Sequence, residues 1–250
     1  MIPEKTLAIF KPISLEEMSG VKLLNRMDKK FTFPYCMLED ILREASAHYR
    51  ILEIDGLRYA HYETRYFDTP EYEMYIKHHN RKLNRNKVRF RTYLDSGIHY
   101  FEVKFKTNKG RTIKKRVNRD LNDFTITGTA EELLQKRTIY PSTALQEAIR
   151  VYYSRITLVS NDLKERLTID LDLSFNHHGH KTGYPGMVIA EVKQDKSAAS
   201  PFIQLMRNKR ISDISISKYC LGIASTVSDI KKNNFKIKLN HVQKLCKATV

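Results

Sequence analysis

Basic side chains alternate with apolar ones along three stretches of the chain. In residues 87–93 the order Lys-Val-Arg-Phe-Arg-Thr-Tyr places the cations on one face of an extended strand, and Val88 and Phe90 on the other. Residues 100–106 and 113–117 repeat the pattern. One face thus gathers the charged residues Lys87, Arg89, Arg91, Glu102, Lys104, Lys106, Lys114 and Arg116. Because Arg offers a planar fork to phosphate oxygens and Lys a point charge, this face is suited to binding phosphate groups.

The same alternation is also typical of the solvated face of a half-buried antiparallel sheet. A solvated face usually mixes charges of both signs, however, and like charges on neighbouring strands repel each other. An enclosed anion would relieve that repulsion. If about eight such strands close into a barrel with these faces inward, the interior is a basic tunnel, wide enough for a phosphate chain but too narrow for duplex DNA.

The elements that must position these residues are mostly strands. Asp95-Ser96-Gly97 and Asn108-Lys109-Gly110 supply turns between the three basic stretches, which predicts a meander. Polar faces are also predicted on strands at residues 26–30, 166–173 and 187–193, with Leu167, Ile169, Leu171 and Leu173 together on one apolar face. Helices are predicted over residues 34–49, 130–136 and 142–149, whereas residues 201–226 show no clean period. The expected fold class is α+β, a closed antiparallel β-barrel with flanking helices.

The amino-acid composition restricts the classes of protein to which this chain can belong. The 250 residues carry 44 Lys and Arg against 28 Asp and Glu, a net charge of +16, and 14 Tyr with 11 Phe exclude a disordered polyelectrolyte. We expect one principal domain over residues 23–226, between an N-terminal lead-in (1–22) and a basic C-terminal tail (227–250). Three scattered cysteines predict neither a disulfide framework nor a zinc site. Without a candidate membrane span or signal peptide, we expect a soluble, cytoplasmic protein.

Short motifs in a fixed order resemble a known family. They are Tyr66-Phe67-Asp68-Thr69-Pro70, Met74-Tyr75, His78-His79, Lys87-Val88-Arg89-Phe90-Arg91, Phe101-Glu102-Val103-Lys104, Tyr153-Ser154-Arg155, Ala190-Glu191-Val192-Lys193 and Ser215 to Tyr219. Together they resemble the polyphosphate polymerase domain of the vacuolar transporter chaperone (VTC) family, in its free-standing bacterial form. That family belongs to the triphosphate tunnel metalloenzymes (CYTH-like), antiparallel barrels with a basic interior. One departure is Asp28, since the family pattern Arg-x-Glu-x-Lys has Glu where this chain has Asp.

The resemblance implies an enzyme, an ATP-dependent polyphosphate polymerase that transfers the γ-phosphate of ATP to a growing polyphosphate chain and releases ADP. It implies that Arg89, Arg91, Lys104 and Arg155 are catalytic residues gripping the triphosphate, and that Glu191 is a ligand for Mn²⁺ or Mg²⁺. The substrate-binding residues it implies are Lys30, His78, Lys106, Lys114, Arg116, Tyr153, Lys193 and Lys218. The expected partners are ATP and inorganic polyphosphate or pyrophosphate, with no dedicated nucleic-acid partner.

Two other functions are consistent with the same residues. A metal-dependent tripolyphosphatase or nucleoside triphosphatase would use the same tunnel with water as the acceptor. A non-catalytic module would bind polyphosphate, nucleic acid or an acidic membrane, and the basic tail from Lys231 to Lys247 is the segment best suited to such surface binding. The lack of a clear catalytic dyad does not count against an enzyme, because phosphoryl transfer depends mostly on alignment and charge neutralisation.

Overall fold

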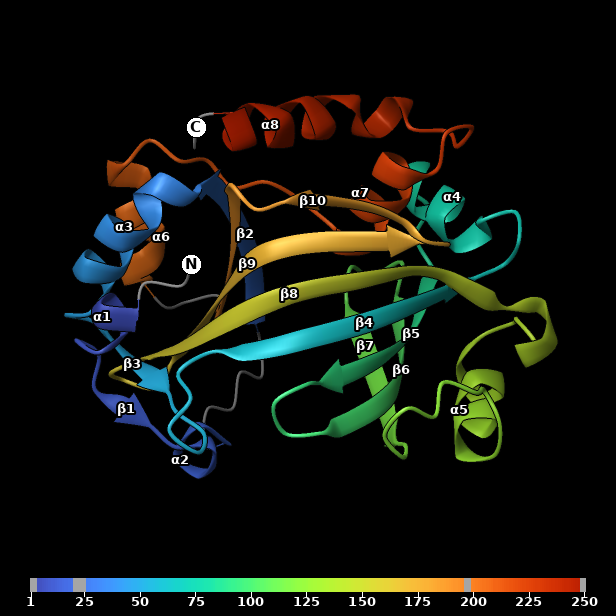
Figure 1. Ribbon diagram of the computed structural model, residues 1–250, viewed down its shortest axis with the longest axis horizontal. Helices are drawn as coiled ribbons and strands as arrows, with labels where there is room; N and C mark the ends of the chain where they lie inside the picture. Colours follow the sequence, from blue (N-terminus) through green and yellow to red (C-terminus); the bar gives the residue numbers. More distant parts are fainter. Residues whose placement is uncertain (1–3, 20–25, 196–198, 248–250) are drawn as a thin grey trace.

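The computed structural model describes residues 4–19, 26–195 and 199–247, and its centre is one 11-stranded sheet (Figure 1). The main path runs in the order β2 (Arg26–Pro34), β11 (Met187–Asp195), β9 (Glu165–His177), β8 (Gln146–Ser160), β4 (Ala60–Asp68), β5 (Arg85–Tyr93), β6 (Ile98–Lys106) and β7 (Thr112–Asn118). Three short strands join it at the side: β1 (Pro12–Ile13), β3 (Tyr49–Leu52) and β10 (His180–Tyr184). Along the main path every pairing is antiparallel.

The predicted meander is present as β5, β6 and β7. In the register, Lys104 lies opposite both Lys87 and Lys114, and Glu102 lies opposite both Arg89 and Arg116. Directly opposed residues of an antiparallel pair point to the same face of the sheet. The basic side chains of the three strands therefore share one face, as the alternation predicted.

The expectation of a closed barrel is wrong, because β2 and β7 end the strand path without pairing to each other. The chain that leads into helix α7 (Lys218–Thr226) runs along the edge of β2 instead. There the backbone N–H of Ile214 donates to the carbonyl of Lys30 over 2.7 Å, and Phe31 and Asp213 form an isolated bridge. This irregular segment occupies edge groups of β2 that another strand would use, so β7 remains an edge strand.

Helices cover both faces of the sheet, and we call the face that α7 contacts the inner face. On the outer face, α3 (Leu38–Ala45) and α6 (Pro201–Asn208) pack over β2, β11, β9 and β8, and α5 (Thr129–Arg137) packs over β5 and β6. On the inner face, Tyr219 and Ile223 of α7 pack against Val151 and Phe175. The long α8 (Lys236–Lys247) lies across β10, β11 and β2, at the top of Figure 1. Shorter helices are α1 (Glu4–Leu7), α2 (Leu15–Ser19) and α4 (Glu73–His79), with 3₁₀ turns at Tyr35–Met37, Ser142–Ala144 and Asn233–Phe235.

The helix predictions succeed only in part. The helix predicted over residues 130–136 is α5, and the one over 34–49 is a 3₁₀ turn followed by α3, which ends at Ala45 before β3 begins. The helix predicted over 142–149 is wrong, because only a 3₁₀ turn forms before β8 starts at Gln146 and pairs with β4. Residues 201–226 contain α6 and α7. Because α7 is buried on nearly every side, its sequence shows no amphipathic period.

One strand changes face in the middle, which corrects a second expectation. Leu167, Ile169 and Leu171 belong to the outer core, but Leu173 belongs to the inner one. Asp172 has a φ of 54°, and the pairing of β9 with β8 shifts by one residue beside it. An extra residue of this kind reverses the side-chain alternation. Asp170, which precedes the shift, faces inward by the regular alternation, whereas Asp172 at the shift is exposed.

Among the residues that the structure describes, none of the helices has the length and apolar character needed to cross a membrane.

Candidate functional site

The inner face has an apolar half under α7 and a charged half beside it. We call the charged half the basic cluster and define it by its cations Lys30, Lys87, Arg89, Arg91, Lys104, Arg155, Lys193 and Lys218, with the carboxylates Glu102, Asp170 and Glu191. These residues come from β2, β5, β6, β8, β9, β11 and the start of α7. Strands β5, β6 and β11 contribute at alternate positions, so the period that predicted these strands also explains their part of the cluster.

The sheet must curl, because side chains from distant strands meet in the cluster. Lys193 lies on β11 and Lys104 on β6, with β9, β8, β4 and β5 between them in the strand order. Burial lowers the pKa of Lys104 well below its usual value, and the charges of Arg89, Arg91 and Lys193 lower it further. Two cations from opposite sides of the sheet therefore lie within electrostatic range of each other, which makes the inner face a basic trough.

One carboxylate holds two of the cations in place. The Arg155 guanidinium donates to both oxygens of Asp170, over 2.5 and 2.8 Å, and the ammonium of Lys218 also donates to Asp170. Burial alone would raise the pKa of the Asp170 carboxyl, but the charges of Arg155 and Lys218 outweigh burial and lower it. Asp170 is therefore an ionised anchor that joins β8, β9 and α7.

A second carboxylate holds Arg89. Its guanidinium Nε donates to Glu102 over 2.7 Å, and Nη1 donates to the Tyr66 hydroxyl over 3.1 Å. Lys114 donates to the other Glu102 oxygen over 3.3 Å from the exposed edge strand. Because Glu102 is fully buried and close to Arg89, its carboxylate largely neutralises the Arg89 guanidinium. Arg89 therefore has a structural role in the fold, whether or not a ligand is bound.

Three cations of the cluster have no such partner. Within the described part of the chain, no carboxylate lies within 4 Å of Lys87, Arg91 or Lys104, and of these Lys87 donates to the Ser217 hydroxyl. Arg91 donates to the Thr64 hydroxyl over 3.3 Å, and its guanidinium carbon lies 5.6 Å from the ring centre of Tyr62. The buried hydroxyl of Tyr153 also has no hydrogen-bond partner in the described part of the chain. Because uncompensated buried charge is unfavourable, this part of the trough is electrostatically incomplete without an anion.

Glu191 is the carboxylate best placed to hold a divalent metal. Its oxygens lie 3.7 Å from the ammonium of Lys30 and 3.6 Å from that of Lys193. Burial opposes its ionisation, but the two lysines outweigh burial and lower its pKa to about 2. Both separations exceed the length of a hydrogen bond, so the lysines leave the Glu191 oxygens able to accept a further partner. No trio of His, Cys, Asp or Glu in the described ranges could hold a metal unaided. The carboxylate of Glu191 could therefore serve as one oxygen ligand of a divalent cation.

A family model described as the VTC domain matches residues 25–227. The chain belongs to the VTC domain family. The resemblance stated from the sequence motifs is thus confirmed, and the fold agrees with the triphosphate tunnel superfamily. A search of curated proteins gives no match.

Two solved structures share the fold of this VTC domain. One is a proposed adenylate cyclase from Bacillus halodurans, with a TM-score of 0.54 and 14% identity over 82% of this chain and 98% of the other. The second is a proposed adenylyl cyclase from Hippeastrum with a dominant triphosphatase activity, with a TM-score of 0.52 and 11% identity over 82% and 98%. At these identities the similarity shows the fold alone.

Four of the candidate residues lie at the margins of the VTC domain's basic cluster. Lys114 and Arg116 are on the exposed edge strand β7, where Arg116 stacks over Tyr100 with 4.0 Å to the ring centre. His78 contacts the Cys220 sulfur through Nδ1 at 3.0 Å. Burial lowers the pKa of His78 to about 2, helped by nearby cations that include Lys106, so the ring is neutral. These four residues lie outside the basic cluster as defined above.

Three residues of the cluster were not among the site residues predicted from the sequence: Lys87, Glu102 and Asp170. Glu102 neutralises Arg89, as described above. The Lys87 ammonium donates to the Ser217 hydroxyl over 2.8 Å and so ties β5 to the start of α7. Asp170 anchors two cations, as described above. Lys87 shares a strand face with Arg89 and Arg91, and Glu102 shares one with Lys104, so the alternation contained the signal for these two residues.

Proposed function

We propose that this VTC domain is an ATP-dependent polyphosphate polymerase, which transfers the γ-phosphate of ATP to an inorganic polyphosphate chain and releases ADP. The observation that carries the proposal is the partly buried pair Arg91 and Lys104, which lacks an acidic partner in the described chain although Asp170 and Glu102 neutralise the cations around it. A triphosphate supplies several negative charges in a row, which suits this trough better than a single carboxylate does.

The residues of the cluster would act mainly by alignment. Arg91 and Lys104 would bind the phosphates of ATP, and the Tyr153 hydroxyl would donate to a phosphate oxygen. Arg155, which is paired with Asp170, would hold the shape of the trough around them. An oxygen of the terminal chain phosphate attacks the γ-phosphorus, the bond from that phosphorus to the β,γ-bridging oxygen breaks, and ADP leaves with the electron pair. The attacking oxygen is already ionised at pH 7, so no general base is needed.

The expected metal fits the carboxylate that the cluster provides. Mn²⁺ or Mg²⁺, when bound, would neutralise charge on the β- and γ-phosphates. Glu191 would hold the ion, and Lys30 and Lys193 would keep this carboxylate ionised through their charges. Their flanking positions would also let both lysines contact the phosphate oxygens next to the metal.

A second candidate function is hydrolysis of triphosphates at the same site. The dominant triphosphatase activity of the Hippeastrum protein with this fold favours it. Water would then take the place of the chain phosphate as the attacking group. Both reactions need the same cations and the same carboxylate, so the residues of the cluster do not separate them.

Product analysis separates the two reactions. We would incubate the purified chain with ATP, a pyrophosphate primer and either Mn²⁺ or Mg²⁺, and resolve the products on a gel beside an orthophosphate assay. Polymerase activity yields long polyphosphate and one ADP per phosphate added, and Arg91→Ala should abolish it. Lys115→Ala is the matched control, because Lys115 is an exposed cation on the outer side of β7, opposite Val103. Orthophosphate without polymer would overturn the polymerase in favour of the triphosphatase.

A further inference from the structure

A row of tyrosines crosses the inner face of the sheet beside the basic cluster. The rings of Tyr153 and Tyr62 stack nearly in parallel with 4.9 Å between their centres, and the ring of Tyr62 lies 4.8 Å from that of Tyr93. Tyr93 meets Tyr100 edge-on at 6.2 Å, and the guanidinium of Arg116 lies over the Tyr100 ring, 4.0 Å from its centre. The row therefore runs from β8 across β4, β5 and β6 to the edge strand β7.

Strand register places the outer end of this row next to the unpaired cations of the cluster. Tyr100 lies directly opposite Arg91, and Tyr93 follows Arg91 by two residues on the same face of β5. Lys104 lies four residues, or about 14 Å, further along β6 than Tyr100. A nucleoside triphosphate lying along the strands, with its terminal phosphates near Lys104, would therefore bring its base to Tyr93 and Tyr100.

The outer end of the row is only partly covered by the described part of the chain. Tyr62 and Tyr153 are buried, and α7 packs over β8, β9 and β10 on this side of the sheet. Tyr93 and Tyr100 are half-buried, and Arg116 is exposed. Cross-strand aromatic pairs can also stabilise a sheet, but rings that served packing alone would gain most from full burial. The exposure of these three groups therefore favours a role in binding.

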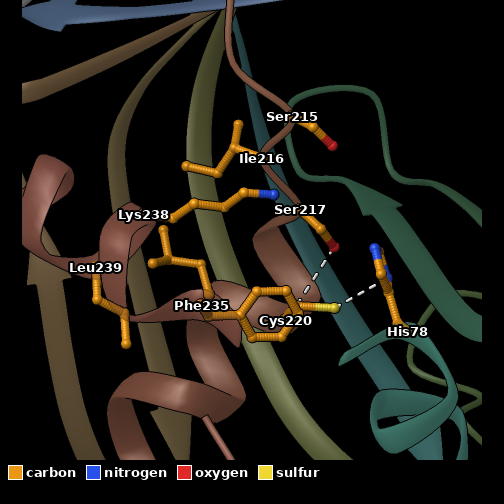
Figure 2. Close-up of a pocket in the computed structure, with 9 residues that line it drawn as sticks. His78, Ser215, Ile216, Ser217, Cys220, Phe235, Lys238 and Leu239 are labelled. Carbon is orange, nitrogen blue, oxygen red and sulfur yellow. Dashed lines mark hydrogen bonds between the residues drawn. The ribbon is translucent and has the colours of Figure 1, made fainter. Parts of the chain in front are cut away.

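The pocket beside the start of α7 offers no comparable place for a base (Figure 2). Its volume of about 20 Å³ is enough for a water molecule and too small for a ring system. Apolar side chains, among them Phe235 and Leu239, form much of its wall, and the His78 ring contacts the Cys220 sulfur at 3.0 Å. The outer end of the tyrosine row is thus the better place for a flat ligand.

We infer that Tyr93, Tyr100 and Arg116 form a subsite for the base of a nucleoside triphosphate whose phosphates occupy the basic cluster. Aromatic faces and guanidinium planes both stack on bases, and stacking tolerates different bases because each has a flat π-face. We therefore expect the subsite to accept adenine and guanine alike. The inference rests on the proposed function for the triphosphate and adds the position of its nucleoside.

Ligands with and without a base provide the test. We would titrate ATP, GTP and tripolyphosphate into the natural chain, Tyr100→Leu and Arg116→Lys, without divalent metal so that no ligand is turned over. Tyr100→Leu keeps an apolar side chain and Arg116→Lys keeps the charge, while each variant loses a flat group. Affinity for ATP and GTP should fall about tenfold in Tyr100→Leu and about threefold in Arg116→Lys, whereas tripolyphosphate affinity should stay within about twofold.

The matched control is Tyr152→Leu, which removes a half-buried tyrosine of β8 on the outer side of the sheet, opposite Glu63. It should leave the affinity for all three ligands unchanged. Equal losses for ATP and tripolyphosphate in Tyr100→Leu would overturn the subsite, because the ring would then support the cations and not a base. Unchanged ATP affinity in Tyr100→Leu and Arg116→Lys would overturn it as well. Failure of ATP-dependent synthesis by the natural chain would refute the polymerase and leave these ratios of affinity as the test of the subsite.

Discussion

At the scale of residues, the cations of the basic cluster differ in what neutralises them. Arg89 and Arg155 are each paired with a buried carboxylate, Glu102 and Asp170 respectively. Arg91 and Lys104 have no such pair within the described chain. The paired cations maintain the shape of the trough, and the unpaired cations supply the positive charge that a bound anion would neutralise. Removing one of each should therefore affect stability and binding differently.

Arg91→Ala should weaken tripolyphosphate binding about tenfold or more while leaving the free energy of unfolding unchanged or slightly higher, because it removes an unpaired cation. Arg89→Ala should lower the free energy of unfolding by about 3–5 kcal/mol, because Glu102 stays buried without its main partner. Denaturant titration and calorimetric binding measure the two effects. Equal stability of the two variants would contradict this division.

The response to pH follows from Lys193. Burial lowers its pKa from 10.5 to about 8, although Glu191 partly offsets the effect. As the pH rises through 8, Lys193 loses its charge and tripolyphosphate affinity should fall. Between pH 8 and 10.5 the unfolded chain binds more protons than the folded one, so the Lys193 contribution to stability rises with pH. Binding and unfolding measured across this range should thus move in opposite directions, and Lys193→Met should reduce both changes. Parallel changes would contradict the assignment.

At the scale of elements, the sequence predicted what depends on a regular period. The alternation of Arg89 and Arg91 with Phe90 is sufficient to define β5 and the face that its cations share. The inward turn of Leu173 could not be predicted, because it depends on the left-handed backbone at Asp172 and a shift in pairing. The failure of closure depends on a long-range contact, between Ile214 and Lys30, that no local pattern contains. The strands could thus be predicted from the local alternation of residues, whereas the shape of the trough depends on tertiary contacts.

The start of α7 links an element to the site. The Ser217 hydroxyl accepts from the backbone N–H of Cys220 and from Lys87, and the next residue, Lys218, reaches Asp170. Ser217→Ala should lower the free energy of unfolding by about 1 kcal/mol through loss of the cap, and it should also weaken tripolyphosphate binding. Ser200→Ala is the control, because it removes the equivalent cap of α6 on the outer face. We expect Ser200→Ala to lose similar stability and no affinity, so an equal loss of affinity would contradict the role of α7.

At the scale of the whole molecule, the net charge of +16 is distributed over two kinds of place. Part of it is gathered on the inner face of a curled, open sheet, where strand pairing sets Lys87, Lys104 and Lys114 side by side. The rest lies on exposed surfaces such as α8, whose sequence contains no acidic residue. Repulsion within the trough works against folding, since like charges on neighbouring strands destabilise a sheet. The natural fold is therefore expected to gain stability when an anion occupies the trough.

This gain can be measured by thermal unfolding. Tripolyphosphate at about 100 times its dissociation constant should add about 2.7 kcal/mol to the free energy of unfolding. A chain of this size should respond with about 2–4 °C in Tm for each kcal/mol. In Arg91→Ala/Lys104→Ala the shift should nearly vanish, and without ligand this variant should unfold at or above the Tm of the natural chain, because repulsion is relieved. Lys115→Ala should keep the full shift, since its cation is on the outer side of β7. If both variants keep the same shift, tripolyphosphate stabilises the protein through its general surface charge and the trough is not its site.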